Sequence, residues 1–212
     1  MRTVFQAQYF TGDAPQMRQE DYDATFLVQA VKGATLNQRQ FSWVTISGKN
    51  VKITHANQDE TLLWFAEWAA PQIDALGNGT KVLVPVPNSH VTKNSKPEFR
   101  TAQMADALAK QLGNAVAAPV LRWKKPMTPS HKGGTRDKNK LYPALEIVGA
   151  IPNGTIILVD DVSTGGGHMT ACAWKLEDIQ RSPAMAVCCG RTVHHQLDNP
   201  FQINPEEVDL KR

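Results

Sequence analysis

The chain contains few of the residues and segments that would place it outside a reducing, aqueous compartment. Its 212 residues include only three cysteines, too few for a disulfide framework, and none of them has zinc-ligand spacing. No apolar run approaches the roughly 18–20 residues that a membrane span needs. The N-terminal stretch "MRTVFQAQYF" has neither the apolar core nor the small-residue cleavage site of a signal peptide. The sequence therefore predicts a cytoplasmic protein without a membrane partner.

Net charge is small but unevenly distributed. The chain carries +3 at neutral pH, yet residues 91–140 hold eleven Lys and Arg against three Asp and Glu. The rest of the chain holds twelve against seventeen. A solvated basic face, a polyanionic small molecule and a nucleic acid are all compatible with this distribution. No aromatic interleaving or known module supports the nucleic acid.

Strand and helix patterns alternate in the second half of the chain. Residues 41–56 predict a hairpin joined by "SGKN", and residues 19–33 and 59–76 predict helices. From residue 81 onward we expect strands over 81–87, 117–123, 155–159 and 184–193, with helices over 98–113 and from about residue 168. Such alternation predicts an α/β protein with a parallel sheet and helical crossovers.

The stretch "TIILVDDVSTGGGHMT", residues 155–170, carries the strongest chemical signal. A β-branched run ends at Asp160 and Asp161, three glycines follow, and a helix begins near His168 or Met169. Glycines let backbone amides approach a ligand closely, and a helix N-terminus favours negative charge. We therefore expect an anion-binding loop with two carboxylates beside it.

The preceding loop, residues 124–142, is long and basic. It holds the pair Gly133-Gly134 and six cations: Lys124, Lys125, Lys132, Arg136, Lys138 and Lys140. Loops of this length are uncommon in compact domains unless they are functional or disordered. A lid that closes over an anion and a disordered connector are the two interpretations. His131 could contact the same anion, although a solvated histidine is the simpler interpretation.

The segment "ILVDDVSTGGGHM" resembles the phosphoribosyl pyrophosphate loop of type I phosphoribosyltransferases. The order of elements from about residue 81 to 193 is similar too, and "LVPVPNS" stands where that family contacts pyrophosphate. Within the family the chain looks closest to the competence-protein-F-like branch. There "PVP" is followed by an arginine and a helix start like "TAQMADALA", and "AVKG" near Val31 resembles a lysine-bearing N-terminal piece.

The resemblance implies a fold and a division of the chain. The expected fold is a type I phosphoribosyltransferase-like parallel sheet flanked by helices, with a small N-terminal hood. Residues 1–79 would form the hood and contact the acceptor, residues 80–195 the core, and residues 196–212 a C-terminal tail. The resemblance does not identify the acceptor base or amine, and it leaves a homodimer open.

The resemblance also implies roles for individual residues. Asp160 and Asp161 would face the ribose hydroxyls and a hydrated Mg²⁺. The 5-phosphate would be bound by the loop Ser163, Thr164, Gly165, Gly166, Gly167 and His168. Pyrophosphate would contact Pro87, Asn88 and Ser89, with Arg100 close by. Lys132 or Arg136 would close over it as catalytic cations.

Two departures from the family pattern affect the phosphate loop. Gly165 replaces a threonine, and His168 stands where a threonine often closes the loop. His168 is either a cation near the phosphate or an exposed first-turn residue. Thr164 stands where purine-salvage members have an acidic residue, which disfavours purine salvage.

The sequence supports two functions. The first is a Mg²⁺-dependent phosphoribosyltransferase with an unidentified acceptor. The second is a regulatory protein that senses phosphoribosyl pyrophosphate or a nucleotide without transfer. The acidic pair and the basic loop favour the first, and Gly165 favours the second.

Overall fold

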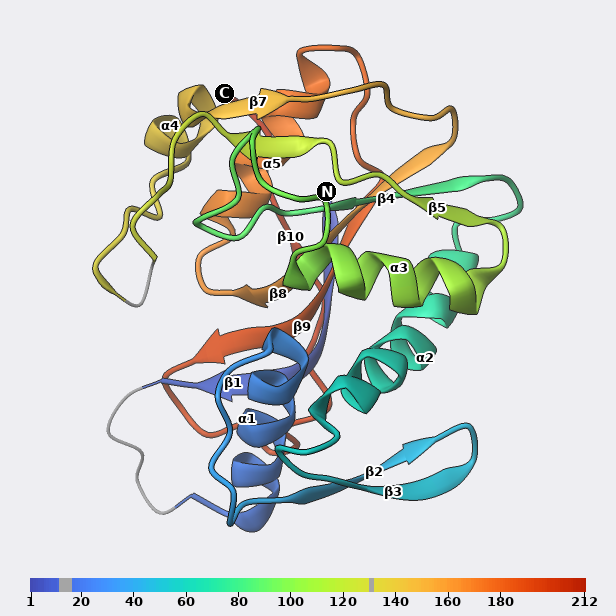
Figure 1. Ribbon diagram of the computed structural model, residues 1–212, viewed down its shortest axis with the longest axis vertical. Helices are drawn as coiled ribbons and strands as arrows, with labels where there is room; N and C mark the ends of the chain where they lie inside the picture. The colour runs from blue at the N-terminus through green and yellow to red at the C-terminus, as the bar shows by residue number, and fades with distance from the viewer. Residues whose placement is uncertain (12–16, 130–131) are drawn as a thin grey trace.

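The fold is built on one mostly parallel sheet with helices on both faces (Figure 1). The computed structural model describes residues 1–11, 17–129 and 132–212. The six-stranded sheet has the order β10-β1-β9-β8-β4-β5. Only β10 (Glu206–Glu207) pairs in the antiparallel sense, at the edge against β1 (Arg2–Phe10). The predicted α/β class with a mostly parallel sheet is confirmed.

The central strands are the ones that the sequence predicted. They are β4 (Lys81–Pro85), β8 (Thr155–Ser163) and β9 (Met185–Val193), with the short edge strand β5 (Ala115–Ala117) beyond β4. Side chains of a strand alternate between the two faces of a sheet. Leu83, Ile157 and Val187 accordingly belong to one core cluster, while Val84, Leu158 and Ala186 belong to the other.

Three helices cover the first face. They are α1 (Gln19–Lys32), α2 (Thr61–Asp74) and α3 (Arg100–Leu112). The predicted inward residues Phe65, Ala69 and Ile73 of α2 are fully buried. Trp64 and Trp68 pack against this cluster, as expected of core residues. The hairpin β2 (Ser42–Ile46) and β3 (Lys49–Ile53) lies beside α1 and α2, and its turn is the two residues Ser47-Gly48 rather than "SGKN".

Helix α5 (Gly167–Glu177) covers the second face. A two-stranded sheet of β6 (Leu121–Trp123) and β7 (Leu145–Ile147) joins it there, with the short helix α4 (Lys138–Leu141). The described residues also form the 3₁₀ turns η1 (Gln58–Glu60) and η3 (Tyr142–Ala144). No helix among the described residues combines the length and apolarity needed to cross a membrane.

The strand expected over 117–123 is wrong as a single element. It divides into β5, which pairs with β4 in the main sheet, and β6, which pairs with β7. Pro119 lies between them, and proline has no N–H to donate to a ladder. The chain therefore leaves the main sheet at the proline, which brings Trp123 onto the α5 face.

Two segments outside the predicted core contribute to its sheet. Strand β1 comes from the segment assigned to the hood, and it pairs in parallel with β9 over eight residues. Strand β10 comes from the segment assigned to the tail. The division at residues 79 and 195 remains a prediction, but these two strands belong to the same sheet as the core.

Candidate functional site

A cavity of about 740 Å³ lies at the carboxyl ends of β1, β4, β8 and β9. Ligands of open α/β sheets bind at this edge, because loops and helix N-termini meet there. Most predicted site residues line this cavity, from four separate stretches of chain: Pro87, Asn88, Ser89, Arg100, Arg136, Asp160, Asp161 and all of 163–168. Their convergence is the main property of the site.

The acidic pair lies at the point where β4 ends and β8 continues. Pro85 is the last residue of β4 and pairs with Val159, whereas β8 remains paired with β9 as far as Ser163. The expectation that the strand stops at the acidic pair is therefore wrong, because pairing with β9 carries β8 on to Ser163. By alternation Asp160 faces the α5 side and Asp161 the α1 side.

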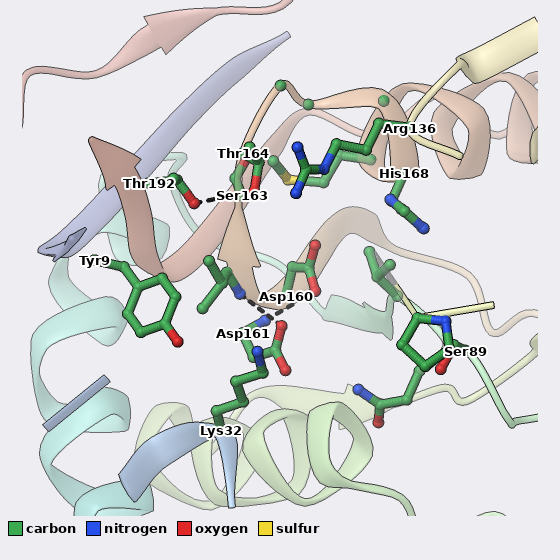
Figure 2. Close-up of a pocket in the computed structure, with 18 of the residues that line it drawn as sticks. Tyr9, Lys32, Ser89, Arg136, Asp160, Asp161, Ser163, Thr164, His168 and Thr192 are labelled. Carbon is green, nitrogen blue, oxygen red and sulfur yellow. Dashed lines mark hydrogen bonds between the residues drawn. The ribbon is translucent and has the colours of Figure 1, made fainter. Parts of the chain in front are cut away.

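Asp160 is buried and Asp161 is half-buried. Asp160 is only 7% exposed. Burial raises its pKa well above the ordinary 3.8, and the charge of Asp161 raises it further. Burial also raises the pKa of Asp161, which the charge of Lys32 opposes. One oxygen of each group accepts a backbone N–H, from Asp161 at 2.9 Å and from Val162 at 2.6 Å respectively (Figure 2).

The predicted anion loop leads directly into α5. Gly166 adopts a left-handed conformation, with φ of 71°, and the helix starts at Gly167. Only glycine adopts this left-handed conformation at little cost in free energy. The Thr164 hydroxyl lies 3.0 Å from that of Thr192, and Arg191 donates to the Thr164 carbonyl, so β9 holds the loop from one side. The unpaired amides of the first turn of α5 then remain available for an anion.

The long basic loop contributes Arg136 to the cavity, but not Lys132. A Cβ placed on Gly167 would lie 1.9 Å from the Arg136 carbonyl oxygen, so this backbone rests directly on the first turn of α5. Figure 2 shows the Arg136 side chain extending over the loop near Thr164. Lys132 is exposed and does not line the cavity. His131 lies outside the described residues.

His168 ends the anion loop and packs against Trp123. Burial lowers its pKa below the ordinary 6.5, and the positive charge of Arg136 lowers it further. Its ring meets that of Trp123 edge-on, with centroids 5.8 Å apart. The interpretation as an exposed residue is wrong, because the side chain is half-buried against Trp123. The interpretation as a cation near a bound phosphate remains a prediction.

The turn after β4 is held by Trp123. The buried indole N–H donates to the carbonyls of Pro87 at 3.1 Å and Asn88 at 3.2 Å. Met127 donates its backbone N–H to the Ser89 carbonyl at 2.7 Å. The side-chain oxygen of Asn88 is buried without a hydrogen-bond partner among the described residues. An unpaired buried acceptor lowers the stability of the fold, and a hydrogen bond from a ligand or a water molecule would restore it.

Arg100 has a different task from the one expected. Its guanidinium donates to the carbonyls of Ala30 and Val31 at the end of α1, and to Asp59 at 2.7 Å. The side chain is thus committed to holding the C-terminus of α1. It borders the cavity, but a role in binding pyrophosphate remains a prediction that these contacts do not favour.

Sequence reasoning missed several residues that line the cavity: Tyr9, Thr11, Lys32, Gly33, His90, Thr192 and His194. Most of them lie at the ends of β1, α1 and β9, which only the parallel pairing of β1 with β9 brings to the site. The one available signal was "AVKG", in which Lys32 directly precedes the Gly33 that ends α1.

The acidic pair fits Mg²⁺ better than a metal held by protein alone. No cluster of three or more His, Cys, Asp or Glu suited to a metal occurs among the described residues, His194 and His195 included. Mg²⁺ usually retains several waters and binds one or two carboxylates together with substrate phosphates. Asp160 and Asp161 each have a second oxygen to which no described group donates. Asn88, whose side-chain oxygen is buried without a partner among the described residues, lines the same cavity.

Comparison with known proteins gives distant structural likenesses only. No protein-family model matches the chain, and no curated protein matches it in sequence. The crystal structure of an adenine phosphoribosyltransferase is 17% identical in sequence, with a TM-score of 0.37. The match spans 81% of this chain and 90% of that protein's chain. A hypoxanthine phosphoribosyltransferase from Staphylococcus aureus is 8% identical, covering 68% and 80%, with a TM-score of 0.36. At such scores the function has to be argued from the site itself.

Proposed function

We propose that the protein binds phosphoribosyl pyrophosphate with Mg²⁺ and transfers the phosphoribosyl group to a small acceptor. The observation that carries the proposal is the convergence of three chemically different walls on one cavity. One wall is an anion loop at a helix N-terminus, the second is an acidic pair, and the third is the turn Pro87–Asn88–Ser89. A sugar that carries a phosphate at one end and a diphosphate at the other requires these three elements.

Each wall matches one part of the donor. The amides of the first turn of α5 and the Ser163 and Thr164 hydroxyls suit the 5-phosphate, and Arg136 adds a positive charge over them. The carboxylates of Asp160 and Asp161 are acceptors for the ribose hydroxyls. The turn after β4 presents backbone groups to the diphosphate, and Trp123 fixes its position.

Transfer breaks the bond between the anomeric carbon and the diphosphate oxygen. The sugar becomes oxocarbenium-like while negative charge grows on the leaving diphosphate, so positive charge and exclusion of water both lower the barrier. Mg²⁺ held by Asp160 and Asp161 would supply neutralisation of the diphosphate. The loop bearing Arg136 covers the phosphate side of the cavity and limits the entry of water there.

Binding without transfer is the second candidate. Two of the three cations expected near the leaving group favour it: Lys132 is exposed outside the cavity, and Arg100 is bonded to the end of α1. A sensor would need the donor pocket alone.

The test combines donor binding with turnover. We expect phosphoribosyl pyrophosphate with Mg²⁺ to raise the melting temperature, since a ligand that binds only the folded state stabilises it. The variant D160N/D161N should lose this shift while remaining folded. The matched control is D74N/D106N, which neutralises two exposed carboxylates outside the cavity.

A panel of nucleobases and small amines, scored for pyrophosphate release, then separates the two candidates. Release with one acceptor, abolished in D160N/D161N and retained in the control, supports transfer. A donor-dependent thermal shift without release for any acceptor supports sensing. The absence of a thermal shift at millimolar donor would contradict both.

A further inference from the structure

The cations that line the donor cavity are not equally available. Three Lys or Arg side chains border it: Lys32, Arg100 and Arg136. Arg100 holds the carbonyls of Ala30 and Val31 together with Asp59. Arg136 lies over the anion loop, on the phosphate side (Figure 2). Lys32 makes no hydrogen bond or ion pair with any residue that the structure describes.

The fold holds Lys32 in this position. It is the last residue of α1, and Gly33 closes the helix in a left-handed conformation with φ of 73°. A Cβ on Gly33 would lie 3.2 Å from the Arg100 side chain, which clamps the end of the helix. The Lys32 ammonium lies 5.6 Å from the centre of the Tyr9 ring. A half-buried amine without an ion pair to any described residue is thereby held at the cavity wall.

The wall that carries Lys32 adjoins the turn after β4. Arg100, the clamp of α1, is the first residue of α3. The next residue, Thr101, is buried and donates its hydroxyl to the Val86 carbonyl, directly before Pro87. Figure 2 shows the Lys32 side chain extending toward Asp161, away from the anion loop. The end of α1 that carries Lys32 is therefore joined, through the first two residues of α3, to the residue before the diphosphate turn.

We propose that Lys32 binds the diphosphate of the donor and neutralises the charge that grows on it. This inference rests on the proposed function and supplies the leaving-group cation that the sequence assigned to Lys132 or Arg136. A lysine ammonium offers three donors and a compact charge, and charge-assisted hydrogen bonds to phosphate are among the strongest in proteins.

A simpler role would be to neutralise the acidic pair alone, without touching the diphosphate. The two roles differ in which ligand they affect. A contact with the diphosphate affects only ligands that contain one. A charge partner for Asp160 and Asp161 affects every ligand whose ribose hydroxyls donate hydrogen bonds to those carboxylates.

The experiment measures the affinity of three probes by calorimetry, each with Mg²⁺: phosphoribosyl pyrophosphate, inorganic pyrophosphate and ribose 5-phosphate. The variants are Lys32→Met, which removes the charge, and Lys32→Arg, which retains it. The matched control is Lys110→Met, because Lys110 also lies in the last turn of a helix capped by a left-handed glycine, and it is exposed. Melting temperatures check that each variant folds.

We expect Lys32→Met to weaken the binding of both diphosphate-containing probes by about tenfold or more and to leave ribose 5-phosphate within about twofold. Lys32→Arg should restore most of the loss, and Lys110→Met should change nothing. An equal loss for ribose 5-phosphate, or no loss for pyrophosphate, would overturn the role of Lys32 and leave the proposed function standing. If the unmodified protein bound none of the probes, the proposed function itself would fail.

Discussion

Replacing Gly167 by alanine is the sharpest test of how the basic loop meets the anion site. The added Cβ would lie 1.9 Å from the Arg136 carbonyl oxygen and 3.1 Å from its carbonyl carbon. Ordinary contact begins at 3.4 Å, so the two backbones must separate by about 1.5 Å. The opposing atom belongs to the main chain and cannot rotate away as a side chain would.

Two opposing effects set the stability of this variant. Alanine is better than glycine in a helix by up to about 1 kcal/mol. Overpacking typically costs about 1–3 kcal/mol, although a surface loop can move at the low end of that range. We therefore expect the free energy of unfolding to change by no more than about 2 kcal/mol, and the protein to remain folded.

The effect of Gly167→Ala on ligand affinity should be larger than its effect on stability. Moving the Arg136 backbone by this distance withdraws its guanidinium from the phosphate, and hydrogen bonds to charged groups contribute about 1.5–3 kcal/mol. Ribose 5-phosphate should then bind about 10- to 100-fold more weakly, as measured by calorimetry.

Gly165→Ala is the matched control. Gly165 is in the same loop, but a Cβ there would meet nothing within 4 Å. We expect this variant to bind ribose 5-phosphate within about threefold of the unmodified protein, a range of under 1 kcal/mol. If Gly167→Ala and Gly165→Ala bound it equally well, the contact between the basic loop and α5 would have no role in phosphate binding.

Two further predictions concern positions outside the anion loop. Buried Asp21 accepts hydrogen bonds from Arg18, Gln8 and Gln196, and the Arg18 bonds contribute most to holding its pKa below the ordinary 3.8. A carboxyl group with a depressed folded-state pKa stabilises the protein above its unfolded pKa and loses that contribution as the pH falls through the folded-state value. Asp21→Asn should therefore lower the free energy of unfolding in urea by about 1–3 kcal/mol at pH 7 and by less below about pH 3.8. An equal loss at both pH values would contradict this reasoning. Trp123→Phe keeps a buried ring but removes the N–H that donates to the Pro87 and Asn88 carbonyls. The affinity for pyrophosphate should therefore fall more than the affinity for ribose 5-phosphate. An equal fall in both would show that the indole only supports the core.

The anion loop and the acidic pair were predictable because their geometry is local. A β-branched run, two aspartates, three glycines and a helical pattern are consecutive in the chain, so strand, loop and helix N-terminus must be adjacent. Only the end of the strand was misjudged. Charge after an apolar run usually marks a strand end, but pairing with β9 carries β8 through Asp160 and Asp161 to Ser163.

The cation opposite the acidic pair could not be found in this way. Lys132 lies 28 residues from Asp160 and belongs to a glycine-containing basic loop, whereas Lys32 is 128 residues away with little around it to mark it. Its position depends on the parallel pairing of β1 with β9 and on the Arg100 clamp at the end of α1. Parallel strands need not be neighbours in sequence, and no periodicity encodes which two will pair. The sequence alone therefore determined that a strand end, two aspartates, a glycine loop and a helix N-terminus adjoin one another, and only the tertiary structure decided which lysine extends toward the aspartates.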